Sequence, residues 1–147
     1  MNFVSASKTS AKHEASVAAN ATHSIEIDTI GFAHASIDVV FSPFTAAATA
    51  AATVLRLAHS DASGSGQANI SGFVGGTDFT VAAGSTTGAS VGYSHRFDVD
   101  LRGKKRYLTV YATPAATVSV ATVARLSKGE VGPVSASDKG VSTQAVG

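Results

Sequence analysis

Residues 93–101 alternate between two kinds of side chain over their whole length. The two sets are Tyr93, His95, Phe97, Val99 and Leu101, and Ser94, Arg96, Asp98 and Asp100. Because successive side chains of a β-strand point to opposite faces, this pattern predicts a strand with one face in a core and the other in water. Strands of this kind are typical of antiparallel sheets, since the strands of a parallel sheet are buried on both faces.

Shorter segments of the chain repeat this alternation. We expect further strands at Ile25–Ile27, Ile37–Phe41, Leu55–His59, Ile70–Phe73, Phe79–Val81, Tyr107–Ala112 and Val118–Leu126. The turn segment Arg102–Arg106 separates two strands, which predicts an antiparallel hairpin of residues 93–101 and 107–112. So many short strands with turn residues between them predict an all-β fold, a jelly-roll-like antiparallel β-sandwich.

The apolar residues of these strands are expected to form one core between two sheets. They are Ile27, Ile37, Val39, Phe41, Leu55, Leu57, Phe97, Val99, Leu108, Val110, Val118 and Val120. A chain of 147 residues is long enough for one such core and too short for two.

The two ends of the chain lack this alternation. We therefore divide the chain into an N-terminal arm at 1–21, a β-sandwich domain at 22–127 and a C-terminal arm at 128–147. The arms have too little apolar surface to offset an ordering cost of about 1 to 2 kcal/mol per residue. We expect contacts with neighbouring subunits to order them, and the sandwich to fold without them.

Two internal segments have the composition of connections. Thr45–Thr53 contains six alanines, which favour helix, but it has no large apolar face to bury, so both a loop and a short helical turn are open. Asp61–Gly66 is rich in Gly and Ser and is expected to be a loop.

The overall charge points to protein partners. The formal net charge is +1 and only 14% of residues are charged, so no strong field attracts the chain to nucleic acid or to a membrane surface. No apolar run is long enough for a signal peptide or a membrane span, and we expect a soluble chain. There is no cysteine, which excludes disulfides, thiolate metal sites and cysteine nucleophiles.

Several residues have side chains that can carry chemistry, and for each of them a structural role is favoured. Ser90 lies in a Gly-x-Ser-x-Gly pattern, but a strand is expected after it rather than the helix of a nucleophile elbow. Asp98 and Asp100 share the solvated face of one strand. The histidines are His13, His23, His34, His59 and His95, and no recognised ligand spacing joins them to one another or to carboxylates.

Two further groups suggest binding. The basic segment Arg102–Arg106 could contact phosphate, although a hairpin tip is also where solvated charges collect. Tyr93, Tyr107 and Tyr111 could stack on a sugar, but all three lie within expected strands. We predict no catalytic residue, no cofactor-binding residue, no metal ligand and no cofactor, and hence a protein that is not an enzyme.

The order of several short motifs resembles a group of small tailed-bacteriophage virion proteins. The motifs are Ile27–Phe32 followed by Ile37–Phe41, Leu55–Asp61, Gly92-Tyr93, Gly103–Val110, and Ala124–Leu126 leading to Gly132-Pro133. Together they span residues 24–135, and the chain departs from the group in its alanine-rich segment and its N-terminal arm.

This resemblance implies a jelly-roll-like decoration, or cement, protein on the exterior of the capsid. The expected function is to stabilise the shell by binding major capsid protein subunits, with a homo-oligomer (trimer or dimer) as the working form and neither nucleic acid nor membrane as a partner. Such a protein is made in the host cytoplasm. The alternative is a non-catalytic module on the same sandwich that binds carbohydrate or a host surface.

Overall fold

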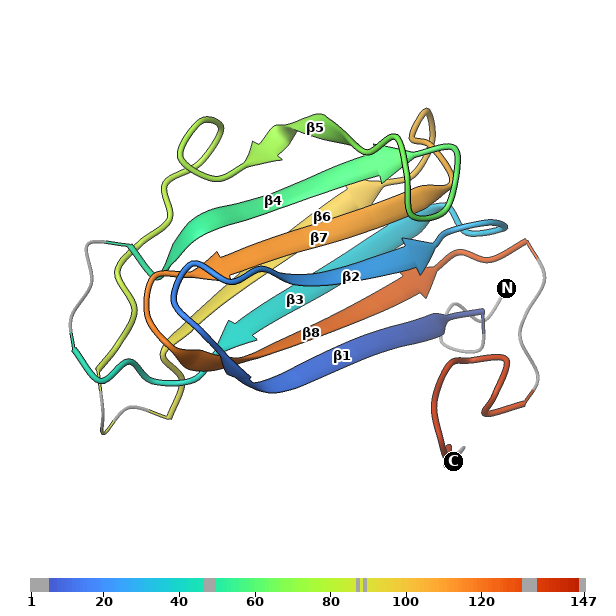
Figure 1. The fold of residues 1–147 in the computed structure, drawn as a ribbon. Helices are drawn as coiled ribbons and strands as arrows, with labels where there is room; N and C mark the ends of the chain where they lie inside the picture. Colours follow the sequence, from blue (N-terminus) through green and yellow to red (C-terminus); the bar gives the residue numbers. More distant parts are fainter. Residues whose placement is uncertain (1–5, 47–49, 87, 89, 131–134, 146–147) are drawn as a thin grey trace.

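The computed structural model describes residues 6–46, 50–86, 88, 90–130 and 135–145. These residues form eight strands in two antiparallel four-stranded sheets packed face to face (Figure 1). The strands are β1 (Lys8–Val17), β2 (His23–Asp28), β3 (His34–Phe41), β4 (Ala52–Ser60), β5 (Ala68–Val74), β6 (Tyr93–Asp100), β7 (Tyr107–Pro114) and β8 (Val118–Ser127).

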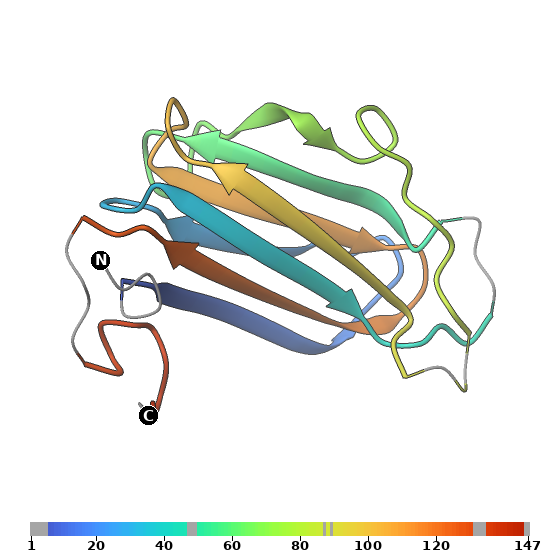
Figure 2. The same ribbon diagram turned by 180° about the vertical axis from the view of Figure 1, so that it is seen from behind.

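The strand order is that of a jelly roll. One sheet has the order β1-β8-β3-β6 and the other β2-β7-β4-β5, so nearly every connection carries the chain from one sheet to the other. Figure 2, from behind, shows the first sheet in front of the second. The predicted jelly-roll-like β-sandwich is therefore confirmed.

The core lies between the two sheets, as the alternation predicts. Each of the twelve expected core residues is at most 5% exposed, and they form one cluster with Ala35, Phe44, Leu126 and their neighbours. The outward side chains of β6, including Arg96 and Asp98, are exposed. The alternation of residue types predicted these core residues correctly, because each strand has one face against the opposite sheet and one face in water.

The predicted hairpin of residues 93–101 and 107–112 is wrong. Both strands exist, but β6 pairs with β3, whereas β7 lies between β2 and β4 in the other sheet. The turn after β6 crosses the sandwich, with Leu101 buried at 7% exposure where the crossing begins. Alternation predicts which face a strand buries, but its hydrogen-bonding partners depend on contacts with distant segments.

The expected strand at Phe79–Val81 is also wrong. Its only ladder contact among the described residues is an isolated bridge between Gly75 and Phe79. The Phe79 ring instead stacks on His95, with ring centroids 4.5 Å apart, and packs edge-on against Phe97 at 6.0 Å. The segment thus buries its aromatic residue by closing the margin of the sandwich beside β6.

The assignment of residues 1–21 to an arm outside the sandwich is wrong for residues 8–17, because these form β1. This strand pairs with β8 along its length, with a bulge between Glu14 and Val17. Its inward side chains include Lys12 and Glu14, which lie at the margin of the sandwich and meet β2 rather than the apolar core. A strand whose inward face is polar has no hydrophobic alternation to reveal it.

The C-terminal segment contacts the edge of β1 in its own chain. The amide of Thr9 donates a hydrogen bond of 2.6 Å to the carbonyl oxygen of Lys139. Gly140 follows with a φ of +69°, and a Cβ there would collide with the Thr9 carbonyl oxygen. The described part of this segment therefore has a partner within the chain, although the sequence suggested only neighbouring subunits.

The alanine-rich segment is a loop where it is described. Residues 45–46 and 50–51 are bends, residues 52–53 begin β4, and residues 47–49 lie outside the described residues. Ala51 is fully buried and its amide donates to the carbonyl oxygen of Ala82 at 2.8 Å. The predicted loop at 61–66 is present after β4.

Candidate functional site

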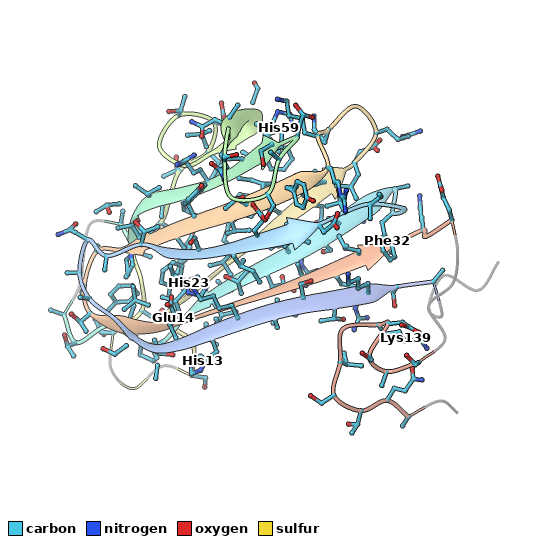
Figure 3. The ribbon with its side chains drawn as sticks, turned by 45° about the vertical axis from the view of Figure 1, so that its right-hand side comes forward. His13, Glu14, His23, Phe32, His59 and Lys139 are labelled. Carbon is cyan, nitrogen blue, oxygen red and sulfur yellow. The ribbon has the colours of Figure 1, made fainter. Side chains whose placement is uncertain are left out.

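A polar cluster joins β1 to β2 at one margin of the sandwich. His23 on β2 is fully buried, and its Nδ1 donates a short hydrogen bond to the Glu14 carboxylate on β1. Its Nε2 accepts from the Thr122 hydroxyl on β8 at 3.0 Å. Lys12 lies 3.3 Å from Glu14 and donates to the carbonyl oxygen of Ser24 at 3.0 Å. Figure 3 shows Glu14 reaching toward His23.

The connection of hydroxyl, imidazole and carboxylate has the order of a catalytic triad, but its burial excludes that role. Thr122 and His23 are both 0% exposed, so no substrate could reach the hydroxyl oxygen. A nucleophile must approach the reacting atom within about 3 to 3.5 Å. We therefore assign this cluster a structural role, which is to hold the edge strand β1 against the second sheet.

The charge state of the cluster follows from its surroundings. Burial lowers the pKa of His23, because the charged imidazolium loses its hydration, and the hydrogen bond to Glu14 opposes this only in part. The hydrogen bond from His23 is the main reason that the pKa of Glu14 is lowered. At neutral pH the cluster therefore combines a neutral imidazole with an ionised carboxylate.

Acidification from about pH 7 to about pH 5 is expected to lower the free energy of unfolding. The folded pKa of His23 lies below its unfolded value of about 6.5, so the unfolded chain takes up the proton first. Stability is full above that value and decreases as the pH falls toward the folded pKa. Glu14 adds a further loss below its ordinary pKa of 4.5, again because its folded pKa is the lower one.

His23→Gln should reduce this loss of stability on acidification, as measured by thermal unfolding at a series of pH values. Some dependence of stability on pH should remain in this variant, since burial also lowers the pKa of His59 and His95. The matched control is His13→Gln, which changes an exposed histidine on the opposite side of β1. If His23→Gln lost as much stability on acidification as the wild type does, His23 would not be a source of the pH dependence.

The residues with possible catalytic chemistry lie apart from this cluster. Ser90 is exposed in a bend, and the strand β6 begins three residues after it, so the strand-turn-helix of a nucleophile elbow is absent there. Asp98 accepts a hydrogen bond of 2.7 Å from the Ser36 hydroxyl. Asp100 binds the Arg102 guanidinium at 3.0 Å, and this hydrogen bond holds the pKa of Asp100 far below its ordinary value.

Carboxylates neutralise most of the basic segment. Besides Arg102, which binds Asp100, Arg106 makes two hydrogen bonds of 2.8 and 2.9 Å to Asp28, and Lys105 lies 2.8 Å from Asp61. Charges already compensated in this way attract phosphate less strongly than free ones do. The geometry therefore favours a structural role for this turn.

Two further histidines and the three tyrosines also have partners in the fold. His13 lies 2.9 Å from the Ser119 hydroxyl, and His59 accepts from the Lys105 amide at 3.2 Å. Arg56 lies over the Tyr111 ring at 4.1 Å and Arg106 over the Tyr107 ring at 4.9 Å, while Tyr93 packs against Phe41. No group of three or more His, Asp or Glu side chains in the described ranges could hold a metal ion.

The outer face of the β1-β8-β3-β6 sheet is open in the part of the chain that the structure describes. A depression of about 310 Å³ lies at its centre, lined by Ser36, Asp38, Arg96, Val123 and Arg125. Val123 is 44% exposed there, and Arg96 makes a bidentate pair with Asp38 at 2.7 and 3.0 Å. Figure 2 shows that no described segment crosses this face.

The outer face of the second sheet is partly covered. The loop after β4 folds back over the sheet, where the Ser63 hydroxyl and the Gly64 amide donate to the Glu26 carboxylate on β2 at 2.6 and 2.8 Å (Figure 1). Thr109 on the intervening strand β7 is only 5% exposed. A partner approaching this face would meet the loop before the sheet.

A groove of about 640 Å³ lies beside the start of β4. It is lined by Ala50, Ala52, Thr53 and residues 75–81. The Asp78 carboxylate accepts from the amides of Gly72 and Val74 at 2.8 and 3.0 Å, so it is used to hold the turn.

The sequence singled out neither the polar cluster nor the open sheet face. Glu14 and His23 are nine residues apart and Thr122 is distant in the chain, so no local spacing relates them. The outward residues of β3, β6 and β8 were recognisable strand by strand, but their assembly into one face depends on strand order.

No protein-family model matches the chain, and no curated protein matches it in sequence. Among the described residues, there is no helix long and apolar enough to cross a bilayer.

Proposed function

We propose that this protein decorates the exterior of a tailed-bacteriophage capsid and stabilises the shell by binding major capsid protein subunits. The observation that carries the proposal is the open outer face of the β1-β8-β3-β6 sheet in a complete jelly roll. Jelly rolls recur in viral shells, and the order of the sequence motifs agrees with this assignment. Fold alone does not determine function, so the proposal depends on the chemistry of that face.

The chemistry of this face suits a protein partner. Its centre combines the exposed Val123 with the small side chain of Ser36. Of the three charged residues that line it, Arg96 and Asp38 form an ion pair, and Arg125 adds a positive charge. Protein interfaces commonly combine apolar contacts with polar groups, and arginine is enriched in them. The near-zero net charge also removes any general repulsion from a neighbouring subunit.

Val123→Asp should weaken capsid binding at least about tenfold, because it places a charge at the centre of a buried contact. Binding is measured by cosedimentation with capsids assembled from the major capsid protein of the same phage. The matched control is Val54→Asp, since Val54 is 36% exposed on a strand of the second sheet. Equal weakening by both variants would contradict docking through this face.

Capsid binding by the wild type tests the function itself. We expect saturable cosedimentation and a higher temperature of capsid disassembly. A full-length protein that binds no capsid would overturn the proposal.

A carbohydrate-binding module is the second candidate, and one observation favours it. The groove beside β4 contains hydroxyl groups from Thr53, Thr77 and Thr80, which can bind sugars. Against this, the ring of Phe79 already stacks on His95. Glycan binding without capsid binding, measured on a glycan array, would replace the first proposal by this one.

A further inference from the structure

β1 is an edge strand that uses one edge for pairing with β8. The Thr9 amide points away from β8, because it donates to Lys139. Backbone groups alternate in direction along a strand, so the amides of Ala11 and His13 point the same way as that of Thr9. Among the backbone hydrogen bonds of the described residues, none reaches Ala11 or His13 from outside the β1-β8 pair. This stretch of edge can accept another strand.

The side chains of this edge are complementary to themselves in one antiparallel register. If two copies of β1 pair about His13, Lys12 of each copy lies opposite Glu14 of the other. Both residues occupy positions of the non-hydrogen-bonded type, where side chains approach most closely. Opposite charges at such positions stabilise a strand pair and like charges destabilise it.

The neighbouring registers are less favourable. Pairing about Lys12 would place the two Lys12 side chains opposite each other. Pairing about Ala11 would require the Thr9 amide, which is already bound to Lys139. The bulge after Glu14 limits the ladder at its other end.

We propose that two copies of this chain associate through antiparallel pairing of β1, centred on His13 and extending over residues 11–15. The two β1-β8-β3-β6 sheets then join into one continuous sheet across a twofold axis. The inference does not rest on the proposed capsid function, because it concerns the free protein in solution.

Charge exchange at Lys12 and Glu14 tests the register. Lys12→Glu alone places Glu opposite Glu twice in the dimer, and Glu14→Lys alone places Lys opposite Lys twice. Each full-length variant should dimerise at least about tenfold more weakly than the wild type in sedimentation equilibrium. An equimolar mixture of the two should recover dimers, because every opposed pair is then Glu with Lys.

Ala11→Pro tests the backbone contact without changing charge. Proline removes an amide on the free edge and leaves the ladder to β8 intact, which edge strands tolerate. This variant should remain folded by circular dichroism and should also dimerise at least about tenfold more weakly. Ala11→Pro therefore still tests the dimer if loss of the Glu14 contact to His23 unfolds the charge variants.

Three results would overturn the inference. The first is a wild-type protein that stays monomeric at about 100 μM, which would make Lys12 a charge that protects the edge from pairing. The second is a dimer that Lys12→Glu and Ala11→Pro leave unchanged. The third is a mixture of the two folded charge variants that fails to recover dimers.

Discussion

Deletion of residues 1–21 is expected to destabilise the sandwich by at least about 4 kcal/mol, a large part of the 5 to 15 kcal/mol of a typical domain. The deletion removes the whole ladder of β1 on β8 and the buried side chains of Ala6 and Val17. It also leaves His23 without its carboxylate partner. Chemical denaturation of the 22–147 protein, followed by circular dichroism, measures the loss.

The control for this deletion is removal of residues 135–147. That change removes the hydrogen bond between Thr9 and Lys139 but leaves every strand in place, so we expect a loss of about 1 kcal/mol. We therefore revise the expectation that the sandwich folds without either arm, and now predict that only the C-terminal arm is dispensable for folding. If the 22–147 protein unfolded at the same denaturant concentration as the full chain, β1 would be peripheral to the fold.

Phe97→Ala is expected to cost about 3 to 5 kcal/mol, the range for removing a buried aromatic side chain and leaving a cavity. Phe97 is 2% exposed, and its ring lies 6.0 Å from those of Phe73 and Phe79 and 4.5 Å from His95. These four rings close the margin of the sandwich at β6. The loss is measured by urea denaturation of the full chain.

Ile30→Ala is the matched control, because Ile30 is a large apolar residue that is 62% exposed. A change at such a site is expected to remain within about 0.5 kcal/mol. A loss below about 1 kcal/mol for Phe97→Ala would show that the aromatic margin contributes little to stability.

The two proposed interaction sites are compatible in space. Capsid docking uses the outer face of the β1-β8-β3-β6 sheet, whereas self-association uses the free edge of β1 in the same sheet. A dimer formed through β1 would therefore present two docking faces on one surface. Two linked sites that engage a repetitive shell together bind more tightly than either site alone.

The sequence by itself determined most of the strands whose inner face is apolar, and twelve residues of the core. In β6, the alternation from Tyr93 to Leu101 is sufficient, because burial of one face and solvation of the other leave a period of two in the residue types. The same signal located β3 and β8. It also marked Arg96 and Asp98 as outward residues, because charged side chains are rarely buried without a partner.

Only the tertiary structure decided which strands are neighbours and what the polar residues do. The chain crosses from β6 to β7 in the opposite sheet, a choice that depends on register with β3, β2 and β4 rather than on the turn itself. The sequence did not predict β1, because its inward side chains Lys12 and Glu14 make hydrogen bonds to β2 instead of apolar contacts. Hydrogen bonding of this kind leaves no hydrophobic period in a sequence. His23 shows the same limit: its two partners are Glu14 on the neighbouring strand β1, nine residues before it, and Thr122, which is distant in the chain.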